Sequence, residues 1–231
     1  MRFLRLLLAA VTLMASTLGA FAAEPKNGVD YATLATPQRV ESGKKIEVTE
    51  FFMYSCPHCN ALEPQMAEWV KKQGDNIAFH RVHVSFSGPN DPQAHAYLTL
   101  EAMGKLDAIH QKIFHAVHVE RNRLNTDDAL LDFVVKNGID KAKYQEYFNS
   151  FAVQTKMKRS AQMMAAYKIN SVPTIAIDGR YVTSPSMAGR PGQPETVSQQ
   201  ATLQVMDALV AMAQGGKGAA AVAGVAKPAN K

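Results

Sequence analysis

The chain contains only two cysteines, and both lie in the segment Cys56-Pro57-His58-Cys59. All thiol chemistry must therefore pass between these two neighbours. Two sulfurs at this spacing can close a small disulfide ring and open it again. Such a short loop gains little stability from a cross-link, because the entropy removed from the unfolded chain grows with the number of residues enclosed. The spacing favours a redox reagent over a structural disulfide.

The first 22 residues have the pattern of a secretory signal peptide. Two arginines precede an apolar run at 6–22, and Ala20-Phe21-Ala22 fits a small-x-small cleavage site. A membrane anchor is the alternative, but the apolar run is short for a span, which needs about 20 residues. We predict cleavage after Ala22 or Ala23 and export to the periplasm.

Composition limits what the exported chain can be. Cleavage after residue 22 leaves 209 of the 231 residues, enough for a substantial core, and lowers the net charge from +5 to +3. Exported proteins fold in an oxidising compartment, where small domains usually carry several structural disulfides. A chain of this size can be stable on its core alone, which leaves the cysteine pair free to react. There is no Lys/Arg block typical of nucleic-acid binding.

The elements around the cysteines favour an ionised thiol. Residues 46–52 predict a strand, and Pro57 suits the first turn of a helix that ends at Gly74. Unpaired backbone N–H groups and the helix dipole then favour a thiolate at Cys56. His58 adds a donor between the sulfurs, and a positive charge when it is protonated. Both effects lower the pKa of Cys56 and make the disulfide a strong oxidant.

The rest of the chain predicts a helical block inside an α/β fold. A second strand covers 77–86, and helices cover 92–103, 106–119, 127–136, 141–149 and 153–168. A hairpin at Asp178-Gly179 joins strands at 173–177 and 180–183. A final helix covers 195–213. The expected divisions are a first part at 23–88, a helical domain at 89–152, a second part at 153–214 and a disordered Gly/Ala-rich tail at 215–231.

One family shares this combination of residues. Glu50-Phe51-Phe52, followed after three residues by the two-cysteine motif, resembles the DsbA family of periplasmic thiol:disulfide oxidoreductases. Val82-His83-Val84, the helical block, Ser171-Val172-Pro173 before the hairpin and the terminal helix also match. The resemblance implies an α/β thioredoxin fold with an inserted helical domain.

The resemblance also implies roles for particular residues. Cys56 resembles the exposed nucleophile and Cys59 its buried partner, with Pro57 and His58 completing the catalytic motif and His58 also facing the substrate. Pro173 resembles a cis-proline that lies against the active-site disulfide.

Three further roles follow from the same resemblance. The backbone of Val172 would be available to an extended substrate. Glu50 resembles a buried acid that exchanges a proton with the second cysteine, and Arg81 stands where a basic residue often pairs with that acid.

Other interpretations of the same residues compete with this one. The cysteines could form half of a zinc site, but no second cysteine pair is present. His115 and His118 with Glu120 could bind a metal, although such histidines are more often surface residues. The methionines Met157, Met163 and Met164 could bind peptides, but core packing is the simpler interpretation. We expect no metal and no cofactor.

The expected protein is a soluble, monomeric periplasmic enzyme that donates its Cys56–Cys59 disulfide to exported proteins with free thiols. A DsbB-like membrane oxidase linked to quinone would restore the disulfide, and no nucleic acid is involved. The alternatives are a disulfide isomerase or reductase of the same fold, or a thiol-independent chaperone or binding module.

Overall fold

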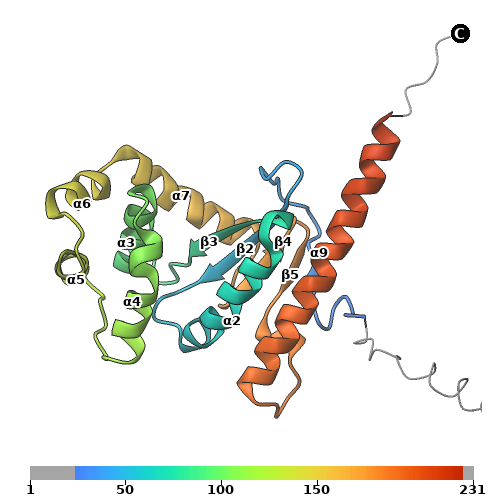
Figure 1. Cartoon of the computed structure of the whole chain (residues 1–231), viewed down its shortest axis with the longest axis horizontal. Coiled ribbons are helices and arrows are strands. Elements are labelled where there is room, and N and C mark those ends of the chain that lie inside the picture. The colour runs from blue at the N-terminus through green and yellow to red at the C-terminus, as the bar shows by residue number, and fades with distance from the viewer. Residues whose placement is uncertain (1–23, 226–231) are drawn as a thin grey trace, which may run out of the picture.

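A five-stranded mixed sheet forms the centre of the molecule (Figure 1). The computed structural model describes residues 24–225, so the predicted signal peptide lies outside the described residues. β2 pairs in parallel with β3, and all other neighbouring strands are antiparallel. The order across the sheet is β1 (Ala32–Thr33), β5 (Tyr181–Thr183), β4 (Thr174–Ile177), β2 (Ile46–Phe52) and β3 (Ile77–His83).

Helices cover both faces of the sheet. α2 (Pro57–Gln73) and α9 (Glu195–Val225) pack on one face, and α7 (Phe151–Ala166) ends on the other. Alternation along β2 sends Val48 into the α2 and α9 core and Phe51 into the core beside α7. By the same alternation Glu50 lies on the α2 side of the sheet.

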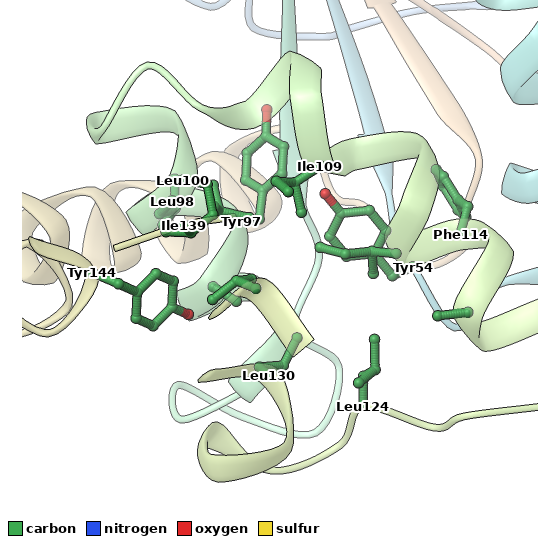
Figure 2. Packing of buried hydrophobic residues seen from close by; sticks show 14 of the residues in the cluster. Tyr54, Tyr97, Leu98, Leu100, Ile109, Phe114, Leu124, Leu130, Ile139 and Tyr144 are labelled. Atoms are coloured by element: carbon green, nitrogen blue, oxygen red, sulfur yellow. The ribbon is translucent and has the colours of Figure 1, made fainter. Parts of the chain in front are cut away.

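A block of four helices is inserted between β3 and α7, at the end of the sheet where β2 delivers the cysteines. Its aromatic and aliphatic core also takes in Phe52 and Tyr54, which lead into the cysteine motif (Figure 2). Burying each such side chain contributes about 1.5–3 kcal/mol. The block therefore anchors the loop that carries Cys56. Its helices are α3 (Pro92–Ala102), α4 (Leu106–His118), α5 (Asp127–Lys136) and α6 (Lys141–Phe148).

Local sequence signals account for several boundaries. Thr126 occupies the N-cap position of α5, and its side chain accepts a hydrogen bond from the Ala129 N–H. Asp178 and Gly179 both have positive φ, 52° and 64°, as a two-residue hairpin turn requires. A side chain at Gly179 would also collide with the backbone carbonyl of Gln38. The predicted hairpin is confirmed.

Some expected boundaries were wrong. β3 ends at His83 rather than Phe86, and neither β1 nor the short α8 (Pro185–Ala188) was predicted. The tail expected to be disordered from Gly215 is helical as far as Val225, because α9 continues past Ala213. Residues 214–225 contain no proline and are rich in alanine, the best helix former. The last part of the expected tail, 226–231, lies outside the described residues.

No helix within residues 24–225 combines the length and the apolar character that a membrane span needs.

Candidate functional site

The two thiols are reduced and differ in access to solvent. Cys56 occupies the N-cap position of α2 and is partly exposed, whereas Cys59 is 1% exposed. The backbone N–H of Cys59 donates to the Cys56 sulfur over 3.4 Å. A partner from solution can therefore reach Cys56 but not Cys59.

The same arrangement separates the acidities of the thiols. The pKa of Cys56 falls to about 6, first because the Cys59 thiol donates a hydrogen bond, then through the backbone N–H groups of Cys59 and His58 and the His58 charge. Donating that hydrogen bond, together with burial, raises the pKa of Cys59 far above its ordinary value. The predicted lowering at Cys56 is confirmed, although its largest cause is Cys59 and not the helix end or His58.

The His58 ring pairs with a residue of α9, where the sequence predicted a donor between the two sulfurs. Its Nδ1 lies 2.7 Å from Glu195 Oε1 in the first turn of α9, with both side chains substantially exposed. The Glu195 hydrogen bond is the main reason that the pKa of His58 is raised. His58 therefore acts on Cys56 through its charge and its backbone N–H. Sequence reasoning missed Glu195, because no local pattern links residues 137 positions apart.

The loop before β4 closes the site from the other side. The Val172–Pro173 peptide bond is cis, as expected, and the Val172 carbonyl oxygen lies 3.5 Å from the Cys56 sulfur. A pocket of about 420 Å³ opens beside it, lined by His58, Val172, Pro173 and Glu195 among others. The loop and the pocket therefore lie directly beside Cys56 and His58.

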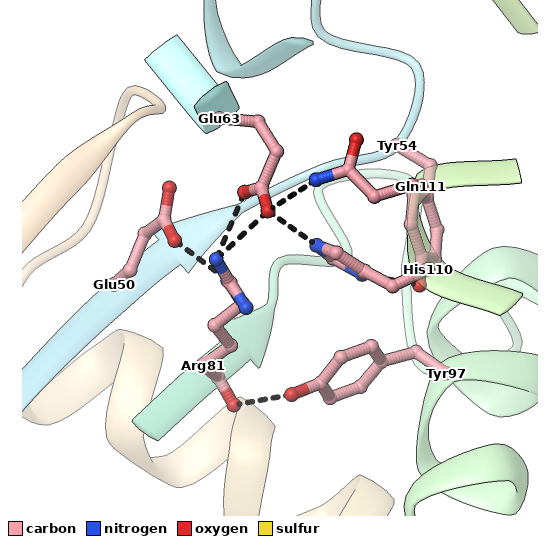
Figure 3. Close-up of polar contacts among 7 residues, drawn as sticks. All are labelled: Glu50, Tyr54, Glu63, Arg81, Tyr97, His110 and Gln111. Atoms are coloured by element: carbon pink, nitrogen blue, oxygen red, sulfur yellow. Dashed lines mark hydrogen bonds and ion pairs between the residues drawn. The ribbon is translucent and has the colours of Figure 1, made fainter. Parts of the chain in front are cut away.

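Arg81 lies at the centre of a buried ion cluster (Figure 3), and the Glu50 member of this cluster is near enough to the cysteines for their charges to act on one another. Glu50 and Arg81 face each other across β2 and β3, and Arg81 Nε donates to Glu50 Oε2 over 2.9 Å. The expected pairing of these two residues is confirmed. Arg81 Nη2 also donates to both oxygens of Glu63 on α2, over 3.0 and 2.9 Å. One guanidinium thus serves two carboxylates.

Burial dominates the acidity of Glu50. It raises the pKa to about 7, with Arg81 opposing the change and the Glu63 charge adding to it. A carboxyl group that titrates near neutral pH is suited to exchanging a proton with a neighbouring thiol. Glu63 was not predicted, but its position four residues after Cys59 on the same helix face was a usable signal.

The model of the DsbA-like thioredoxin domain matches residues 47–201, which include both cysteines, Glu50 and the Val172–Pro173 loop. The chain belongs to the DsbA-like thioredoxin domain family. Its fold is accordingly a thioredoxin fold with an inserted helical domain, and its activity is thiol:disulfide interchange.

Known members of the family match this chain over nearly their whole length. The thiol:disulfide interchange protein DsbA of Burkholderia cepacia is 38% identical over 214 residues, which cover 92% of this chain and 97% of the relative. The crystal structure of Pseudomonas aeruginosa DsbA is 32% identical and superposes with a TM-score of 0.75, over 84% of this chain and 96% of that chain. The DsbA structure from Xylella fastidiosa is 26% identical, with a TM-score of 0.73 over 83% and 98% of the two chains.

The residues considered for other functions have different partners. His115 contacts Glu120 over 3.1 Å on the surface, whereas His118 Nε2 lies 2.8 Å from the backbone oxygen of Tyr54 and steadies the loop before Cys56. Met157 is partly buried against the core of the helical block, and the other two methionines are partly buried against the core beside α7. Within residues 24–225 no three His, Cys, Asp or Glu side chains converge as metal ligands.

Proposed function

We propose that this chain is a periplasmic dithiol oxidase, which gives its Cys56–Cys59 disulfide to exported proteins. The observation that carries the proposal is the contrast between the two thiols: an accessible Cys56 with a pKa of about 6 and a buried Cys59 with a raised pKa. A reduced form stabilised in this way makes the disulfide form oxidising.

Transfer takes two exchange steps. A substrate thiolate attacks the Cys56 sulfur of the disulfide, a mixed disulfide forms, and the Cys59 sulfur leaves and takes up a proton. A second substrate thiolate then attacks the substrate sulfur of the mixed disulfide. Cys56 departs as a thiolate, and its low pKa makes it a good leaving group. The substrate has lost two electrons to the cysteine pair.

Glu50 handles the proton of Cys59. A buried carboxyl group with a pKa of about 7 can give a proton to the departing Cys59 thiolate and take it back when the pair is re-oxidised. Arg81 and burial set that acidity together.

We expect the loop at Val172 and Pro173 to hold extended substrates, because its backbone borders the Cys56 sulfur. The predicted signal peptide and family membership support the periplasm as the place of action and exported proteins as the substrates. A DsbB-like membrane protein linked to quinone accepts the two electrons from the reduced pair. The enzyme works as a monomer.

A direct test mixes the disulfide form with a reduced, unfolded protein that has two cysteines. We expect stoichiometric oxidation of that protein, and Cys56→Ser should abolish it. In the matched variant Cys59→Ser, Cys56 remains but has no cysteine partner within the chain. Its thiol should therefore form a mixed disulfide with a substrate that carries a disulfide, and this mixed disulfide should persist. Oxidising activity that survives Cys56→Ser would overturn the proposal. Reshuffling of wrong disulfides without net oxidation would indicate an isomerase, and aggregation suppression independent of both cysteines a chaperone.

A further inference from the structure

The inserted helical block supplies two side chains to the ion cluster around Arg81 (Figure 3). Gln111 Nε2 on α4 donates to Glu63 Oε1 over 2.9 Å, and His110 Nε2 lies 3.5 Å from the same oxygen. His110 is buried, whereas Gln111 reaches the carboxylate from the surface. Neither residue takes part in the disulfide exchange described above.

Tyr54 fixes the way His110 faces Glu63. Its hydroxyl lies 2.8 Å from His110 Nδ1, and burial raises the pKa of the Tyr54 phenol so that the phenol keeps its proton. Burial also lowers the pKa of His110, which favours the neutral ring. A phenol that donates to Nδ1 leaves the ring proton on Nε2, the nitrogen that faces the Glu63 carboxylate. The opposite tautomer would set a lone pair against that carboxylate.

Arg81 is shared unequally between the two carboxyl groups. It carries one positive charge between them, and a buried ionised carboxylate is costly without compensation. Glu63 receives two hydrogen bonds from Arg81 and one from Gln111, while His110 Nε2 lies 3.5 Å from Glu63 Oε1 without making a hydrogen bond. Among the described residues, Glu50 receives a side-chain hydrogen bond from Arg81 alone.

We infer that His110 and Gln111 are positioning residues for disulfide transfer: they hold the Glu63 carboxyl group against Arg81, and so limit how fully Arg81 can pair with Glu50. The inference rests on the proposed role of Glu50 as the proton partner of Cys59. It gives the inserted helical block a part in the chemistry as well as in packing.

Removing these contacts would free the Glu63 carboxyl group from its place beside Arg81. Arg81 could then pair more fully with Glu50, and Glu50 would remain ionised to lower pH, where it holds no proton for Cys59. The titratable groups that bear on Glu50 and Glu63 come from every surrounding element: Arg81 of β3, Tyr97 of α3, His110 of α4, Tyr54 of the connecting loop, and Cys56 and Cys59 at the start of α2.

The test is a carbon NMR titration of the glutamate carboxyl groups in the full-length reduced protein, with Glu50→Gln and Glu63→Gln used for assignment. Gln111→Leu, at a surface position, removes a hydrogen bond to Glu63 and should lower the titration midpoint of Glu50 by roughly half a pH unit, because only part of the effect of that bond reaches Glu50 through Arg81. His110→Leu should act in the same direction.

Two further variants separate positioning from a general loss of stability. His110→Gln keeps an acceptor for Tyr54 and a donor for Glu63, so it should restore the wild-type midpoint of Glu50. His95→Gln changes another histidine of the helical block, one that bonds to the Phe148 carbonyl, and should leave the midpoint unchanged. If His110→Leu does not fold, Gln111→Leu decides the question.

A wild-type Glu50 midpoint in Gln111→Leu would overturn the inference, as would an equal shift in His95→Gln. The titration does not depend on oxidation of any substrate. Failure of the proposed function would appear in the protein-oxidation assay, and failure of this inference would appear only in the carboxyl midpoints.

Discussion

Replacing Cys59 tests the unexpected finding that the second thiol, more than His58, lowers the pKa of the first. Cys59→Ala removes the hydrogen bond from Cys59 to the Cys56 sulfur, whereas Cys59→Ser keeps a donor at the same place. We therefore expect the pKa of Cys56 to rise in the alanine variant and to stay at about 6 in the serine variant.

The size of the change follows from the geometry. A hydrogen bond to a charged acceptor contributes about 1.5–3 kcal/mol, but a thiol is a weak donor and Cys56 is half exposed, so we take about 1 kcal/mol. That corresponds to a rise of somewhat less than one pKa unit. Backbone N–H groups of His58 and Cys59 remain in place and keep the pKa below that of an ordinary thiol.

The assay follows the ultraviolet absorbance of the thiolate and the rate of reaction with an aromatic disulfide between pH 4 and pH 9. Cys56→Ser is the control, since its signal near pH 6 should vanish. Equal midpoints in the alanine and serine variants would refute the assignment of the main effect to Cys59, and a midpoint near that of a free thiol in wild type would refute the whole account of Cys56.

Three further outcomes are expected. Glu195→Gln should lower the pKa of His58, measured by NMR titration of the ring, and an unchanged midpoint would mean that their contact is not maintained in solution. Glu50→Gln should flatten the stability profile of the reduced protein: protonated Glu50 stabilises the fold below its unfolded pKa of about 4.5, and this contribution is lost as pH rises through about 7. Wild type should therefore lose about 2 to 3 kcal/mol more than the variant between pH 5 and pH 8 in denaturant titrations, and parallel profiles would contradict the raised pKa. The reduced protein should resist denaturant better than the disulfide form at pH 7, and because the Cys56 pKa is depressed this advantage should shrink as pH falls through about 6; equal midpoints at both pH values would exclude a stabilised thiolate.

Much of the fold could be predicted because its signals are local. β2 has the predicted bounds, and the helices of the inserted block follow apolar periodicity and caps close to those expected. β1 and α8 were missed because two and four residues are too short to show a period. The end of α9 was misjudged because the Gly/Ala-rich composition of residues 215–231 predicts a disordered tail, whereas the helix continues through the alanines of this segment as far as Val225.

The residues of the site also differ in whether a local sequence pattern could locate them. Cys56, Cys59 and the loop at Pro173 stand in short motifs, so the sequence and its family resemblance locate them. Glu195 and His110 come from segments far along the chain, and their contacts exist only once α9 and the helical block have packed beside α2.

Equilibration of the Cys56–Cys59 pair against mixtures of reduced and oxidised glutathione tests the central claim most directly. The free thiols are trapped by alkylation, and mass spectrometry then gives the fraction of protein in the disulfide form. This fraction gives the equilibrium constant between the cysteine pair and glutathione. The account predicts that the pair stays largely reduced even when oxidised glutathione is in excess, because the Cys56 thiolate stabilises the dithiol form. A pair that remains oxidised in strongly reducing mixtures would contradict a disulfide donor.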